Sequence, residues 1–169
     1  PDSRFWIRHQ ENSNAALLDG LRYVAPRIDN LIDNALADDG LPSQALALVG
    51  FSEGALVALH VGLRRSHEVA GILCFSGCLV GPAELKSEIT AHPPVYLIQG
   101  DNDPGLPTHV LSDSIADLMR AGVHADSHVC PGMGHSINKE AVNRGAKFLT
   151  RIFHIHRNPP AKKKDGAEA

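Results

Sequence analysis

The chain has 169 residues, of which 43% are apolar and 21% charged, a composition typical of one soluble globular domain and unlike that of a fibrous or disordered chain. Its 19 Asp and Glu residues outnumber 16 Lys and Arg residues, which gives a net charge of −3 with histidines neutral. No overall positive field attracts phosphate backbones, so we expect no nucleic-acid partner.

The first half of the chain predicts a helix, a strand and a second helix. Apolar residues at helical spacing predict an amphipathic helix between the capping residues 12–14 and the turn at 38–42, with Leu31 on its inward face. Pro26 should kink or split this helix, because proline lacks a backbone donor. The unbroken apolar run 45–49 predicts a strand covered on both faces, as in a parallel sheet. Residues 55–63 are apolar nearly all round and predict a buried helix.

The second half continues the alternation. Apolar runs predict further strands at 69–75 and 95–98, and a weaker strand candidate lies at 124–130. Helical stripes predict a helix at 110–119 with Met119 inward and a last helix from Ser136, capped by that serine, with Val142 inward. Strands that alternate with helices imply an α/β fold, mainly a parallel sheet flanked by helices.

The segment that contains Gly81 and Pro82 is predicted to be a loop. We expect residues 1–157 to form a single domain and the charged, proline-bearing residues 158–169 to form a flexible tail.

The cysteines and the first residues of the chain indicate the cellular compartment to expect. Cys74, Cys78 and Cys130 are an odd number and too few for a disulfide framework, which favours packing roles in a reducing environment. The first residues lack the basic and apolar regions of a secretory signal, and no run approaches the roughly 20 apolar residues of a membrane helix. We therefore expect a cytoplasmic protein without a membrane span.

The sharpest local motif is Gly50-Phe51-Ser52-Glu53-Gly54, which lies between a predicted strand and a predicted helix. A Gly-x-Ser-x-Gly motif in this context is typical of a strained turn that presents a nucleophilic serine. We expect the glycines two residues to either side of Ser52 to be needed because a side chain there would clash. Ser52 would then project at the carboxyl end of the sheet, where open α/β sheets bind ligands.

A serine nucleophile needs a base to take its proton and an acid to orient the base. The loop after the strand at 95–98 contains Asp101 and Asp103, and spacing alone leaves both open as the acid. His135 follows the strand at 124–130 after a Gly-Met-Gly turn and is the candidate base. His154 and His156 are spaced i, i+2 on a helix, where side chains diverge, so we expect them to be solvated.

These motifs resemble those of the carboxylesterase/phospholipase family of α/β-hydrolases, the group that includes acyl-protein thioesterases. The segment 50–54 is similar to the family's Gly-Phe-Ser-Gln-Gly motif, with Glu53 in place of Gln. The segment 99–104 resembles its His-Gly-x-x-Asp loop, and this match places the acid at Asp103. The pair Gly134-His135 resembles the family's Gly-His motif, and Ser76-Gly77 resembles the end of its next strand.

The resemblance departs from the family at the front of the chain. Family members carry further strands there, including a loop that supplies one half of the oxyanion hole, so we expect a truncated α/β-hydrolase. The backbone N–H of Glu53 is the one oxyanion donor that can be assigned. The strand that leads to Ser52 would present an open edge, and we expect a second copy or a complementing segment to cover it.

The resemblance implies a serine carboxylesterase that hydrolyses short esters or thioesters through an acyl-enzyme. Ser52 would be the nucleophile, His135 the base and Asp103 the orienting acid, with no metal or organic cofactor required. The alternative, favoured by the missing oxyanion loop, is a non-catalytic fragment that acts as an oligomeric binding module.

Overall fold

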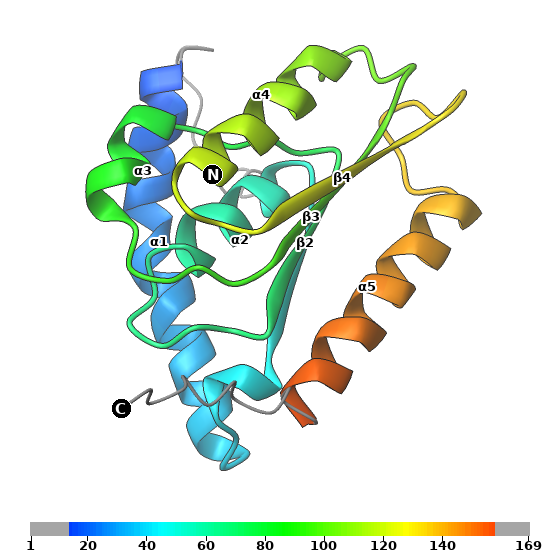
Figure 1. Ribbon diagram of the computed structural model, residues 1–169. Helices are drawn as coiled ribbons and strands as arrows, with labels where there is room; N and C mark the ends of the chain where they lie inside the picture. Colours follow the sequence, from blue (N-terminus) through cyan, green and yellow to red (C-terminus); the bar gives the residue numbers. More distant parts are fainter. Residues whose placement is uncertain (1–13, 158–169) are drawn as a thin grey trace, which may run out of the picture.

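The computed structural model describes residues 14–157, and these form a four-stranded sheet between layers of helices (Figure 1). The strands pair in parallel in chain order, β1-β2-β3-β4. Their bounds are Ala47–Phe51 (β1), Gly71–Phe75 (β2), Val95–Gly100 (β3) and Ala125–Cys130 (β4). The predicted α/β fold with a parallel sheet is confirmed.

Helices cover both faces of the sheet. In Figure 1, α2 and α4 lie on one face, α5 lies on the other, and α1 packs on the outer side of α2. The helices are α1 (Asn14–Asp38), α2 (Glu53–Gly62), α3 (Pro82–Glu88), α4 (Thr108–Arg120) and α5 (Lys139–Arg157), with a short 3-10 turn at Ser43–Ala45. In the segment 14–157, no helix is both long and apolar enough to cross a membrane.

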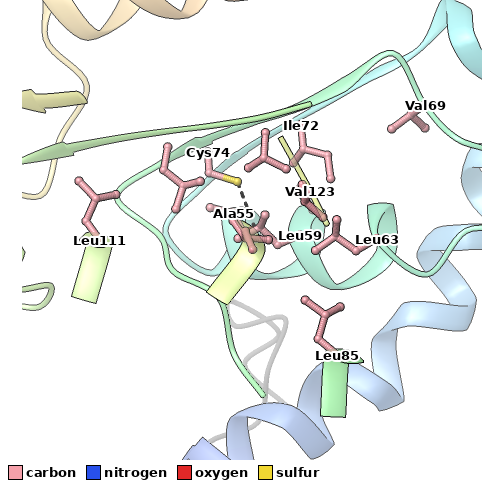
Figure 2. Close-up of a cluster of buried hydrophobic side chains, with 13 residues drawn as sticks. Ala55, Leu59, Leu63, Val69, Ile72, Cys74, Leu85, Leu111 and Val123 are labelled. Atoms are coloured by element: carbon pink, nitrogen blue, oxygen red, sulfur yellow. Dashed lines mark hydrogen bonds between the residues drawn. The ribbon is translucent and has the colours of Figure 1, made fainter. Parts of the chain in front are cut away.

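The larger hydrophobic cluster lies between the sheet and α2 (Figure 2). Leu59 of α2 and Leu63, which caps the end of that helix, pack in one cluster with Ile72 of β2, and all three are buried. The thiol of Cys74 donates to the carbonyl of Ala55 at 3.6 Å, the dashed line of Figure 2. Cys74 is fully buried, and burial raises the pKa of its thiol, so this cysteine packs as a small apolar side chain.

Pro26 does not split the first helix, because α1 runs through this residue as one helix. The prediction of a split is therefore wrong. Packing against α2 stabilises both halves, since Leu18 and Leu21 before the proline and Ile32 after it are all buried in one cluster with α2. Leu31, expected to face inward, is 66% exposed. The proposed capping residues 12 and 13 lie outside the described residues.

Several predicted boundaries and faces also change. The first strand begins at Ala47, because residues 43–45 form the 3-10 turn. The segment expected to be a loop after Gly81 is α3: Gly81 adopts a left-handed conformation, with φ 66°, and Pro82 occupies the first helical turn. Met119 of α4 and Val142 of α5 were expected to point inward, but their side chains lie on the outward faces of these helices and are 62% and 54% exposed.

The last helix begins at Lys139, three residues later than predicted, and its cap is Asn138. The side-chain oxygen of Asn138 accepts the N–H of Ala141 at 2.8 Å, whereas Ser136 donates its backbone N–H to the carbonyl of Gly134. The prediction that Ser136 caps this helix is therefore wrong. Residues 136–138 belong to the loop that carries His135, which is longer than predicted.

Candidate active site

The turn between β1 and α2 presents Ser52. Its backbone has φ 55° and ψ −124°, a conformation that residues other than glycine rarely adopt. The N–H of Ser52 donates to the carbonyl of Phe75 at 2.9 Å, and the Ser52 carbonyl accepts the N–H of Ala55 at 2.9 Å. Ser52 precedes α2, but its hydroxyl makes no capping bond to the helix and is available for other contacts.

The two glycines of the motif differ in what surrounds them. A Cβ added to Gly50 would lie 2.3 Å from the carbonyl oxygen of Gly54, a backbone contact that no side chain can tolerate. A Cβ added to Gly54 would meet nothing within 4 Å in the described residues, apart from the backbone of its own helix. The predicted steric need for glycine thus holds at Gly50 and is wrong at Gly54.

The three predicted side chains form one line of hydrogen bonds. His135 Nε2 lies 2.9 Å from Ser52 Oγ, and His135 Nδ1 lies 2.8 Å from Asp103 Oδ2. The Asp103 side chain is fully buried, whereas the His135 side chain is 42% exposed. A buried carboxylate that binds Nδ1–H leaves Nε2 as the acceptor for a serine hydroxyl, which is the arrangement a general base requires.

Asp101, the alternative acid, makes a different contact. Its Oδ1 accepts the backbone N–H of Gly132 at 2.6 Å, which connects the loop after β3 to the loop before His135. The same loops meet where Asn102 N–H donates to the Met133 carbonyl at 3.0 Å. Asp101 therefore supports the position of the His135 loop, and Asp103 is the carboxylate that contacts His135.

Two further residues contact this arrangement, and sequence reasoning did not identify their roles. The Phe51 ring lies 5.0 Å from the His135 ring, centroid to centroid. Gln99, fully buried at the end of β3, donates from Nε2 to the Leu106 carbonyl across the acid loop. Ser76, which directly follows β2, is the other residue besides Ser52 and the glycines that has a positive φ in the described chain, at 47°. Phe51 could have been suspected because it lies within the motif, whereas no pattern marks the loop contact of Gln99.

One cavity and one group of side chains able to bind a metal ion lie apart from the three candidate residues. A cavity of about 410 Å³ is lined by residues of α1, α2 and α3, including His60, and by Arg64, which follows α2; none of the three candidate residues lines it. Among the described residues, side chains able to bind a metal ion converge at His128, Cys130 and Glu140, outside the line from Ser52 to Asp103. The chemistry that this line supports is nucleophilic attack by a serine hydroxyl.

Comparison with known proteins agrees with this geometry. The phospholipase/carboxylesterase family model matches residues 5–153. Acyl-protein thioesterase 1 of Neurospora crassa is 33% identical over 119 residues, which is 67% of this chain and 48% of that protein. Acyl-protein thioesterase 1 of Schizosaccharomyces pombe is 30% identical over 79% of this chain and 61% of its own length. The chain thus spans about half to three fifths of these two relatives.

A solved structure extends the likeness to three dimensions. The crystal structure of esterase PE8 superposes with a TM-score of 0.81 at 34% identity, covering 86% of this chain and 68% of that one. The family model spans most of the chain, including the segments that carry Ser52, Asp103 and His135. The chain therefore belongs to the phospholipase/carboxylesterase family of α/β-hydrolases.

Proposed function

We propose that this chain is a serine carboxylesterase that hydrolyses short carboxylic esters or thioesters. The observation that carries the proposal is the hydrogen-bonded line from Ser52 Oγ through His135 to Asp103, held on three loops at the carboxyl ends of β1, β3 and β4. Relatives described as acyl-protein thioesterases and an esterase support the same reaction class.

In the proposed first step, Ser52 Oγ attacks the acyl carbonyl while His135 Nε2 takes the hydroxyl proton. The tetrahedral intermediate then expels the alcohol or thiol, which receives that proton from His135, and the acyl group stays on Ser52. Water attacks this ester in the second step, again with His135 as base, and releases the acid and free Ser52. Asp103 stays ionised throughout and stabilises the imidazolium.

The proposed oxyanion donor is the backbone N–H of Glu53, the first residue of α2. The positive end of the helix dipole at this position favours the negative charge that develops on the carbonyl oxygen. The N–H of Ser52 itself is not a candidate, because it donates to the Phe75 carbonyl. The loss of one oxyanion donor typically lowers kcat by about 10²–10³-fold. The turnover rate of the protein therefore depends on whether a second donor lies opposite the N–H of Glu53.

A second candidate function is a non-catalytic binding module that assembles through β1. In the described part of the chain, β1 is an edge strand, and Val49 and Phe51 on it are 54% and 39% exposed. An apolar edge favours strand addition, so we also propose that a second copy or another segment covers β1. A well-defined oligomer without ester turnover would favour the module over the enzyme.

Labelling with a fluorophosphonate probe tests the nucleophile directly, because the probe phosphonylates activated serines. We expect the unsubstituted protein to be labelled and Ser52→Ala to remain unlabelled. Ser112→Ala, which changes an exposed serine on α4, is the matched control and should label like the unsubstituted protein. Equal labelling of the unsubstituted protein and Ser52→Ala, or none of either, would contradict the proposed nucleophile.

A further inference from the structure

A cluster of three side chains with metal-ligating atoms lies beside the His135 loop. His128 and Cys130 are two residues apart on β4, so both side chains point to the same face of the sheet. Glu140 reaches them from the first turn of α5. One ligand atom from each residue lies within 4.8 Å of the other two.

We propose that His128, Cys130 and Glu140 bind one Zn²⁺ ion, with water as the fourth ligand. A tetrahedral zinc ion with bonds of about 2.0–2.3 Å holds its ligand atoms about 3.3–3.8 Å apart, so shifts of about 1 Å would close the site. Imidazole, thiolate and carboxylate together suit a borderline-soft cation and not Mg²⁺ or Ca²⁺, which prefer oxygen.

The contacts of the cluster favour an ion at this position. His128 Nε2 lies 2.7 Å from Glu140 Oε1, so the cation would take the place of the proton that these atoms share. The Cys130 thiol proton would pass to solvent, and the imidazole would bind the ion through Nε2 in the neutral form that carries its proton on Nδ1. Arg144 Nε donates to Glu140 Oε1 at 3.2 Å, an outer contact that can hold the carboxylate in place.

An ion bound at this cluster would affect the loop that carries His135. Cys130 precedes the turn that leads to His135, and Glu140 follows that loop on α5. The Cys130 carbonyl also accepts the N–H of Asp101 at 3.3 Å, so the same residue contacts the acid loop. A zinc ion would therefore join the two ends of the His135 loop and stabilise the folded chain by mass action.

The experiment uses Zn²⁺ and Co²⁺ as probes, with chelator-treated, reduced protein. We expect one Zn²⁺ per chain at saturation, a rise in Tm with Zn²⁺, and a sulfur-to-cobalt charge-transfer band with Co²⁺ that Zn²⁺ abolishes. Cys130→Ser should remove this band, and His128→Gln and Glu140→Gln should each weaken Zn²⁺ binding by roughly tenfold or more. These readouts do not depend on esterase activity, so they stand or fall separately from the proposed function.

The controls are Cys78→Ser and His154→Gln, which change other candidate ligands in the chain and should bind as the unsubstituted protein does. Absence of the cobalt band, or zinc affinity that is unchanged in Cys130→Ser or lost in His154→Gln, would overturn the proposal. If circular dichroism shows that Cys130→Ser does not fold, the decision rests on the other two ligands. Unchanged affinity in both His128→Gln and Glu140→Gln would then refute the site.

Discussion

Asp101 and Asp103 are separated by one residue, yet their carboxylates make different contacts. Asp103 Oδ2 contacts His135, and its Oδ1 accepts the N–H of Gly105 at 3.0 Å. Asp101 Oδ1 accepts the N–H of Gly132 instead. Spacing could not separate the two acids, because both follow β3 in the same loop and either can bind a backbone amide. The family resemblance selected Asp103, and the hydrogen bonds agree with that choice.

Substitution of each acid should therefore have a different effect. Asp103→Asn is expected to lower kcat for an aryl ester by about 10³–10⁴-fold, because the amide no longer fixes the imidazole tautomer. Asp101→Asn should keep kcat within about tenfold and lower the free energy of unfolding by about 1 kcal/mol through a weaker bond to Gly132. Steady-state kinetics and urea unfolding measure the two effects. Similar kcat losses in both variants would contradict this division of roles.

The two motif glycines provide a second pair of substitutions. Gly50→Ala should lower the free energy of unfolding by about 2–3 kcal/mol or more, because its Cβ meets the Gly54 carbonyl oxygen at 2.3 Å. Gly54→Ala should change it by less than about 1 kcal/mol and can raise it, because alanine favours the helix. Urea unfolding of both variants tests the difference. A Gly54→Ala variant as unstable as Gly50→Ala would show that the turn has no room at either position.

At the scale of elements, periodicity predicted the order of strands and helices well and their inward faces less well. Unbroken apolar runs identified β1, β2 and β3, and the runs of β2 and β3 reflect helices on both faces of the sheet, since these two strands are almost wholly buried. The strand β4 has no such run, and β1 has exposed side chains at Val49 and Phe51. The short helix α3 was missed because Leu85 is its one buried residue, which leaves no apolar stripe to detect. Leu31, Met119 and Val142 show the same limit, since each lies next to an inward residue and only packing decides which of the neighbours is buried.

The packing of α2 also predicts a pH dependence. His60 on α2 is 4% exposed, and burial, assisted by the positive charge of Arg64, lowers its pKa from 6.5 to about 4. Below pH 6.5 the unfolded chain takes up a proton that folded His60 does not bind. The contribution of His60 to the free energy of unfolding is therefore complete above pH 6.5 and falls by up to about 3 kcal/mol as the pH drops to 4.

Urea unfolding between pH 4 and pH 7 checks this expectation. The unsubstituted protein should lose more stability on acidification than His60→Gln, because the variant lacks the buried imidazole. Hydrogen bonds from Arg22 and His128 lower the carboxyl pKa values of Glu88 and Glu140 respectively, and these two groups contribute equally to both profiles. His67→Gln, which changes an exposed histidine, is the matched control. Parallel profiles for the unsubstituted protein and His60→Gln would contradict the account of this buried ring.

At the scale of the whole molecule, β1 and β4 are the two edge strands of the described sheet, and β1 is the edge with exposed large apolar side chains. The backbone of β1 pairs with β2 on one side, and the side chain of Val49 is 54% exposed. We expect the protein to associate through this edge, and Val49→Lys should weaken the association because a charged side chain opposes strand addition. Val142→Lys is the control, since Val142 on α5 is also 54% exposed.

Sedimentation velocity over a range of protein concentrations measures the association. The unsubstituted protein and Val142→Lys should form a species larger than a monomer at concentrations where Val49→Lys is a monomer. A monomer at all concentrations would remove the need for a second copy at β1, and an oligomer that is unaffected by Val49→Lys would place the interface elsewhere.

The central claim is that Ser52, His135 and Asp103 hydrolyse an ester as one unit, and turnover of a short-chain aryl ester tests it most directly. The measurement compares the unsubstituted protein with Ser52→Ala in fractions whose solution mass is determined in parallel. We predict steady turnover by the unsubstituted protein and its loss in Ser52→Ala at the same mass. Equal rates in the two proteins, or no turnover by a folded, well-defined unsubstituted species, would contradict the claim.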